Sequence, residues 1–156
     1  MANGKTSAGV VLAAGAAGGV AEVLWIAAAA TVLGADGWAI ARAVSTTVVP
    51  DLGASGLAPW IGLLVHFLLS IALAAVLARA LRYLPAASIW LAAPAALAAV
   101  WAFNFLVLLP LINPAFVSLL PHPVTLISKL LFGAAMAAVL VRRAGHDRST
   151  LSGETP

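Results

Sequence analysis

Four long apolar segments dominate the pattern of hydrophobic and polar positions along the chain. A helix needs about 20 apolar residues to cross the hydrocarbon core of a bilayer, and each of these segments is close to that length. They run from Ala8 to Leu33, from Ala58 to Arg82, from Ser88 to Leu109 and from Pro123 to Val141. The pattern therefore predicts an all-α membrane protein, a bundle of four transmembrane helices that forms one domain over residues 1–143.

Glycine and proline mark the expected ends of these helices. Gly34 ends the first segment, and Pro59 falls in the first turn of the second, where a missing N–H costs nothing. Pro110 is expected to end the third helix. Pro94 lies inside that helix and is expected to kink it, because proline removes a backbone hydrogen bond and crowds the preceding turn.

The segments between the helices are less regular. In 35–57, apolar positions recur at helical spacing, which fits a short helix lying in the membrane interface and an ordinary loop equally well. These positions are Trp38, Ala41, Val44 and Val48. The segment 111–122 is apolar but is interrupted by Pro114 and Pro121, so we expect it to enter the interface without crossing. The polar tail, residues 144–156, is expected to be disordered and cytoplasmic.

Composition supports the membrane interpretation. Of the 156 residues, 63% are hydrophobic and only 8% are charged, whereas a soluble domain keeps roughly a quarter of its residues charged. The outer surface is therefore expected to face membrane lipid. The formal charge of +3 is scattered along the chain, so no nucleic-acid partner is expected. The absence of cysteine excludes disulfides and thiolate metal sites.

The distribution of lysine and arginine predicts the orientation. Positive residues favour the cytoplasmic side of a membrane, and one side of the predicted bundle carries Lys5, Arg79, Arg82, Arg142, Arg143 and Arg148. The other side carries only Arg42. An even number of spans places both termini on the same side, and these charges predict that this side is the cytoplasm. The abundant alanine is typical of bacteria with GC-rich genomes, so we expect the bacterial inner (plasma) membrane.

Each predicted helix carries one polar residue at membrane depth: Glu22, His66, Asn104 and Lys129. An ionisable group near the middle of a bilayer costs at least about 2.5–3.5 kcal/mol, so each needs a partner. At about 1.5 Å per residue, all four lie between the middle of the bilayer and its outer surface. We expect the bundle to bring them together as a candidate binding cluster.

Small residues share a helix face with three of these four positions. Residues spaced by three, four or seven lie on one face of a helix, and small side chains there let helices approach closely. The residues expected to pack helices are Gly15, Gly19, Gly62, Ser70 and Gly133. Glu22, His66 and Lys129 are therefore expected to point toward protein.

The polar residues also fit a purely structural role. Lys129 could extend along its own stem to the outer interface, or pair with Glu22 as a neutral bridge. His66 and Asn104 could form hydrogen bonds between helices. The sequence leaves the structural and the functional interpretation open.

Three short motifs carry a resemblance to known proteins: His66-Phe67-Leu68-Leu69-Ser70, Asn104-Phe105 through Pro110, and Phe132-Gly133. With these motifs the chain resembles short bacterial four-helix integral membrane proteins of unknown function, some of which carry a transporter label. In similar sequences a histidine is expected near the start of the last helix, where this chain has Lys129. The resemblance implies the four-helix architecture and no activity.

Three functions follow from these features, in this order. The first is a non-catalytic subunit or assembly component, working as a homo-oligomer or within a larger membrane complex; no catalytic motif or cofactor is predicted. The second is an oligomeric proton-coupled transporter or channel using Glu22, similar to small multidrug exporters, which place one glutamate in the first of four helices. The third is a haem or quinone site with His66 as the ligand.

Overall fold

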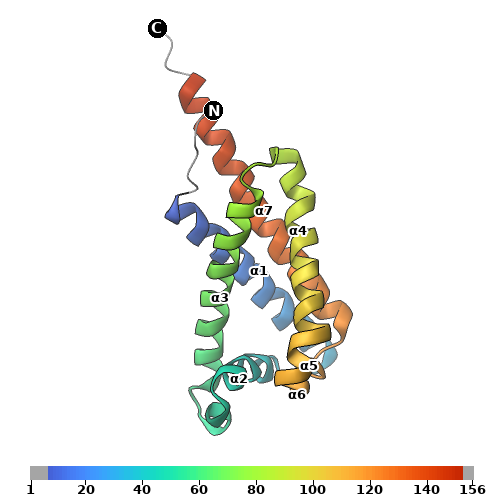
Figure 1. Cartoon of the computed structure of the whole chain (residues 1–156). Coiled ribbons are helices and arrows are strands. Elements are labelled where there is room, and N and C mark those ends of the chain that lie inside the picture. Colours follow the sequence, from blue (N-terminus) through green and yellow to red (C-terminus); the bar gives the residue numbers. More distant parts are fainter. Residues whose placement is uncertain (1–6, 153–156) are drawn as a thin grey trace.

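The computed structural model describes the backbone of residues 7–152 and the side chains of residues 7–143 (Figure 1). Over the described residues, every regular element is a helix. Four helical stretches are long and apolar enough to cross a membrane. They are α1 (Ala8–Leu33), α3 (Ala58–Leu81), the stretch Ala86–Ile112, and the part of α7 from His122 to Arg143. The four long apolar helices expected from the sequence are thus confirmed.

Local chemistry fixes both ends of α1 at the predicted positions. The Ser7 hydroxyl accepts a hydrogen bond from the Val10 N–H at 3.4 Å, as an N-cap serine does. Gly34 follows the last turn with φ 66°, a left-handed conformation that glycine adopts without strain. The first long helix therefore begins and ends where its capping residues stand.

The third long helix continues past Pro110, so the predicted end at this proline is wrong. It consists of α4 (Ala86–Phe103), the π-helical turn η2 (Asn104–Leu108) and α5 (Leu109–Ile112). Proline has no N–H and its ring crowds the carbonyl four residues earlier. The wider turn accommodates this, because the Leu109 N–H bonds to the Asn104 carbonyl five residues back.

The connector between α1 and α3 contains a helix, α2 (Gly37–Val48), followed by the 3₁₀ turn η1 (Pro50–Ala54). Helix α2 lies across the end of the bundle opposite the start of α1 and the end of α7 (Figure 1). It packs directly on α3: a Cβ built on Gly62 would lie 1.8 Å from the Ala41 carbonyl oxygen. Of the two interpretations of 35–57, the helix is the one present, and it is part of the bundle's packing.

Helix α7 joins the two sides of the bundle. It packs on α1 and on α4, while α3 packs on α1 and α2 and contacts α4 little. Phe132 and Met136 of α7 and Leu97 of α4 are fully buried at this centre. Since α3 and α4 are each held by other helices, a space can remain between them.

The connection after α5 contains only one helical turn, α6 (Pro114–Val117), and does not cross the bundle. At the other end of the chain, α7 (His122–Ser152) extends beyond the predicted end at Val141. It includes residues 144–152, which the sequence assigns to a disordered tail. Residues 1–6 and 153–156, with Lys5 among them, lie outside the described range.

Candidate functional site

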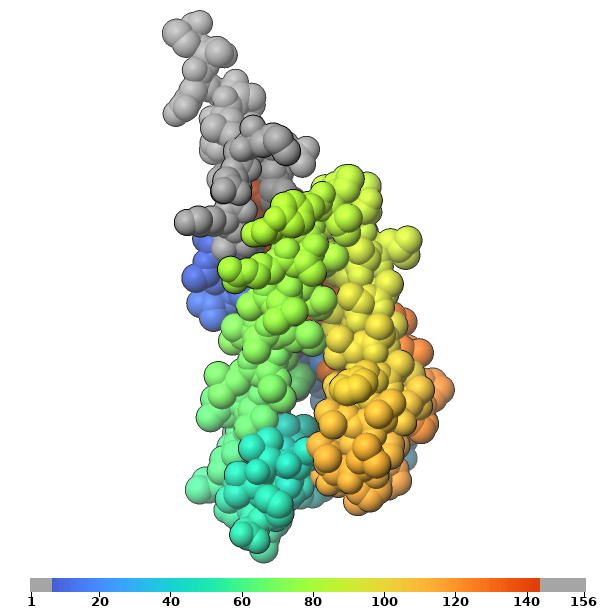
Figure 2. Space-filling view, in the orientation of Figure 1, coloured from blue at the N-terminus to red at the C-terminus, as the bar shows by residue number. Residues whose placement is uncertain are grey.

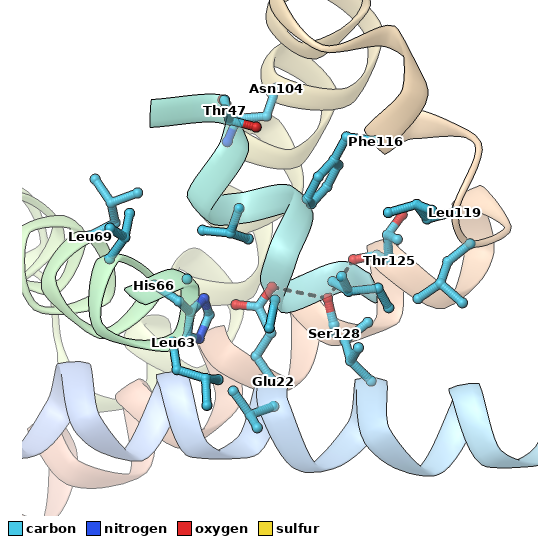
Figure 3. Close-up of a pocket in the computed structure, with 18 of the residues that line it drawn as sticks. Glu22, Thr47, Leu63, His66, Leu69, Asn104, Phe116, Leu119, Thr125 and Ser128 are labelled. Atoms are coloured by element: carbon cyan, nitrogen blue, oxygen red, sulfur yellow. Dashed lines mark hydrogen bonds between the residues drawn. The ribbon is translucent and has the colours of Figure 1, made fainter. Parts of the chain in front are cut away.

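Glu22 of α1 and Lys129 of α7 form an ion pair inside the bundle. The Lys129 Nζ lies 2.6 Å from Oε1 and 2.8 Å from Oε2 of Glu22. The Glu22 side chain is only 11% exposed and the Lys129 side chain only 16%. Ser128 adds a hydrogen bond from its hydroxyl to Oε1 at 3.2 Å (Figure 3). Both carboxylate oxygens therefore have partners, and the pair is neutral as a unit.

His66 of α3 lies beside this pair. Its Nε2 is 3.3 Å from the carbonyl oxygen of Gly19, which precedes Glu22 on α1 by about one turn. Because a carbonyl only accepts, the hydrogen of this bond belongs to Nε2. A haem iron usually binds a histidine through that same nitrogen, so the observed contact competes with the haem ligation considered above.

A cavity of about 810 Å³ opens in front of the ion pair and is lined by all four predicted polar residues. Most of its wall is apolar and comes from α1, α2, α3, the third long helix and α7. Glu22, Lys129 and His66 form one polar region of the wall. Asn104 lies on another part of the wall, near Thr47 of α2 (Figure 3). The four residues thus face one space, but Asn104 is not in the same contact cluster as the other three.

The cavity has a lateral opening between α3 and α4. Figure 2 shows this opening between the green α3 and the yellow-orange third helix, just above the teal α2. Residues of both flanking helices line the cavity, among them Leu69 of α3 and Val100 of α4. In a bilayer, an opening between two apolar helices faces the acyl chains.

Helix α2 and the segment after α5 close the end of the cavity away from the termini. The Asn113 side-chain amide donates to the Thr47 hydroxyl at 2.8 Å and approaches the Ala43 carbonyl at 3.5 Å. Phe116 and Leu119 lie beside this contact and line both the large cavity and a smaller pocket of about 230 Å³ beyond it. The Asn113–Thr47 bond therefore lies between the cavity and the surface.

Two tryptophans hold the start of α7 near the site. The Trp25 indole donates to the Val124 carbonyl, and the Trp101 indole to the Thr125 hydroxyl, each at 2.9 Å. Tryptophan near the end of a transmembrane helix is typical of an aromatic belt at the membrane interface, whereas these two indoles bond to α7. Nothing in the sequence identified these two contacts, because the partner positions depend on how α7 packs.

The predicted helix-packing residues lie at close contacts within the bundle. A Cβ on Gly15 would lie 2.6 Å from the Ile71 Cα, and one on Gly133 would lie 2.6 Å from the Pro94 Cα. A Cβ on Gly19 would lie 3.2 Å from the Ser70 hydroxyl. These contacts join α1 to α3 and α4 to α7, so the small residues lie between helices of one chain.

Comparison of the chain with protein-family models, with curated proteins and with solved structures finds no match. Among the described residues, no group of three or more histidine, cysteine, aspartate or glutamate side chains is placed to hold a metal ion. The site is therefore interpreted from its own geometry, an apolar cavity with a neutral ion pair in its wall.

Proposed function

We propose that this chain is a non-catalytic, multi-pass membrane protein that binds a lipid-soluble molecule within its helix bundle. The molecule's apolar part lies in the cavity and its polar group reaches the Glu22–Lys129 pair. The observation that carries the proposal is the cavity itself: about 810 Å³, mostly apolar, with polar groups on part of its wall. Sites for small molecules have this volume and this composition.

Residence in a membrane is supported by the outer surface. Large apolar side chains are exposed along the long helices, including Leu24, Leu68 and Phe103, where water would be unfavourable. Figure 1 shows the start of α1, the end of α7 and the α3–α4 connection at the same end of the bundle. That connection carries Arg82, which favours the cytoplasmic side. We propose the bacterial inner membrane with both termini in the cytoplasm.

The ion pair argues against the proton-coupled alternative. A carboxylate that exchanges protons during transport must be free to bind one, but both oxygens of Glu22 contact Lys129. Binding without proton exchange therefore fits the pair better than coupled transport by Glu22. The apolar outer surface also offers an area on which partner subunits or further copies of the chain could pack.

Native mass spectrometry of the protein in mild detergent tests the proposal. We expect the wild-type protein to retain a bound small molecule. Ala27 lines the cavity and Ala28 does not, so Ala27→Phe places a ring inside the cavity beside the site while Ala28→Phe adds the same ring outside it. Loss of the bound molecule in Ala27→Phe and its retention in Ala28→Phe is the expected result. A wild-type protein that carries nothing, or equal retention in both variants, would refute the proposal.

A further inference from the structure

The charges that line the cavity limit the kind of molecule that fits it. Apart from His66, its charged residues over the described part of the chain are Glu22 and Lys129. These two neutralise each other, with Lys129 Nζ 2.6 Å and 2.8 Å from the two carboxylate oxygens. The cavity wall therefore has no net charge when His66 is neutral.

Building on the proposed function, we infer that the molecule bound in the cavity is uncharged and carries a hydrogen-bonding polar group, as a quinone or a long-chain alcohol does. A ligand carboxylate would find its natural partner, Lys129, already bound to Glu22. A ligand ammonium would find Glu22 already bound to Lys129. Either charged ligand would leave one charge uncompensated in a medium of low dielectric constant, which is strongly unfavourable.

The wall of the cavity offers hydrogen bonds to a neutral group. In the described part of the chain, no hydrogen bond from the Asn104 side-chain amide to another protein group is found, while the amide lines the cavity. An amide carries both donors and an acceptor, so it can bond a carbonyl or a hydroxyl. Thr47 also lines the cavity, but its hydroxyl already donates to the Ala43 carbonyl and accepts from Asn113. Polar groups on two separate parts of the wall suit a neutral molecule that is polar at more than one point.

The lateral opening between α3 and α4 supports the same class of ligand (Figure 2). A molecule dissolved among acyl chains reaches this opening without crossing water. Charged amphipathic molecules hold their heads at the bilayer surface, whereas uncharged ones enter the hydrocarbon region more easily. The position of the opening and the neutral wall thus both favour an uncharged molecule that is soluble in the hydrocarbon region.

Photo-crosslinking in lipid nanodiscs tests the inference. Three diazirine probes share one alkyl chain and differ only in the head: an alcohol, a carboxylate and a trimethylammonium. Each is added at the same mole fraction, and the yield of adduct on cavity peptides is measured by mass spectrometry. The yield in Ala27→Phe serves as the background. We expect the alcohol to give at least about tenfold more specific adduct than either charged probe.

Charge variants test whether the charge of the cavity wall, and not the depth of the probe in the bilayer, determines the yield of adduct. Lys129→Met leaves Glu22 without its partner and is expected to raise the yield of the trimethylammonium probe. Glu22→Gln leaves Lys129 and is expected to raise the yield of the carboxylate probe. The double variant restores a neutral wall and with it the preference for the alcohol. If one single variant does not fold, the comparison of the three probes on the wild-type protein and the remaining variants still shows whether the cavity prefers an uncharged ligand.

The outcomes separate the two proposals. If no probe labels the wild-type cavity above background, ligand binding itself is refuted, and the inference fails with it. If a charged probe labels the wild-type protein as well as the alcohol does, only the inference about charge is refuted. A zwitterionic phospholipid as the molecule retained from native membranes would likewise overturn the neutral class while leaving ligand binding intact.

Discussion

Lys129 lies 2.6 Å from Glu22, a residue 107 positions away in the chain, and their ion pair joins the first and last helices of the bundle. The pair is placed by packing on both sides: Gly18 of α1 lies against the ring of Phe132, one turn after Lys129 on α7. A Cβ on Gly18 would lie 2.7 Å from that ring, so the two helices approach closely here. The ion pair and this close contact of α1 with α7 therefore lie about one helical turn apart.

Breaking this pair from one side is expected to destabilise the bundle. Lys129→Met leaves the carboxylate in the bundle without a cation, which costs about 3 kcal/mol. The double variant Glu22→Gln/Lys129→Met leaves no charge and is expected to recover most of that loss. Thermal unfolding in detergent, followed by circular dichroism, measures the effect.

The exposed pair Asp36–Arg42 is the matched control for that experiment. Water screens its charges, so Arg42→Gln is expected to change the unfolding temperature much less than Lys129→Met does. A double variant of the inner pair that is no more stable than Lys129→Met alone would contradict the account.

Gly62→Ala tests the packing of α2 on α3. The added Cβ would lie 1.8 Å from the Ala41 carbonyl oxygen, so one of the two helix backbones must move. We expect the free energy of unfolding to fall by about 1–3 kcal/mol and the α2 amides to be less protected in hydrogen exchange. Gly9→Ala is the control, since a Cβ there meets nothing within 4 Å and alanine favours a helix. Equal stability of the two variants would show that α2 is not held against α3.

Much of the fold follows from the sequence, and the reasons are local. The four long helices are fixed by runs of apolar residues and by caps such as Ser7 and Gly34. The sequence left the pairing of Glu22 with Lys129 as one of two alternatives for Lys129, while the small residues on both helix faces predicted that the two side chains point toward protein. These features depend on spacing along single helices, which the sequence contains directly.

The rest depends on tertiary arrangement. The cavity exists because α3 and α4 are each held by other helices, and no periodicity in the chain predicts the space between them. The predicted end at Pro110 is wrong because a π turn absorbs the proline, and that turn also positions Asn104. Asn104 was expected in one cluster with the ion pair; it lines the same cavity, and among the described residues no hydrogen bond joins its side chain to the pair.

Thr47→Val tests whether the Asn113–Thr47 bond keeps the cavity closed at this end. Valine has the shape of threonine but accepts no hydrogen bond, and loss of one such bond is worth about 1 kcal/mol. The chain has no cysteine, so Val44→Cys provides a single thiol that lines the cavity. We expect a polar thiol reagent to label it about fivefold faster when Thr47→Val is added.

The labelling experiment has an internal reference. A cysteine at Gly56, on the exposed segment after α2, is expected to react at the same rate with and without Thr47→Val. An unchanged rate at Val44→Cys would mean that the bond does not control access from this end. Access to the cavity would then be expected through the lateral opening between α3 and α4.

The lowered pKa of Asp36 predicts that the start of α2 loses stability in acid. The hydrogen bond from Arg42 lowers the pKa of Asp36 below its ordinary value of 3.8, assisted by the Trp38 N–H at the start of α2. A lowered pKa stabilises the fold above the ordinary value, and this contribution is lost as the pH falls through the lowered value. In an NMR titration we expect a midpoint below 3.8 that rises in Arg42→Gln. A midpoint at or above 3.8 in the wild-type protein would contradict the N-cap geometry.

The most direct test of the central claim is an experimental density map of the protein in nanodiscs made from native membranes, at a resolution that shows side chains. The account predicts continuous density in the cavity between α3 and α4 that reaches the Glu22–Lys129 pair. A cavity that is collapsed, or that contains only separate water molecules, would contradict it.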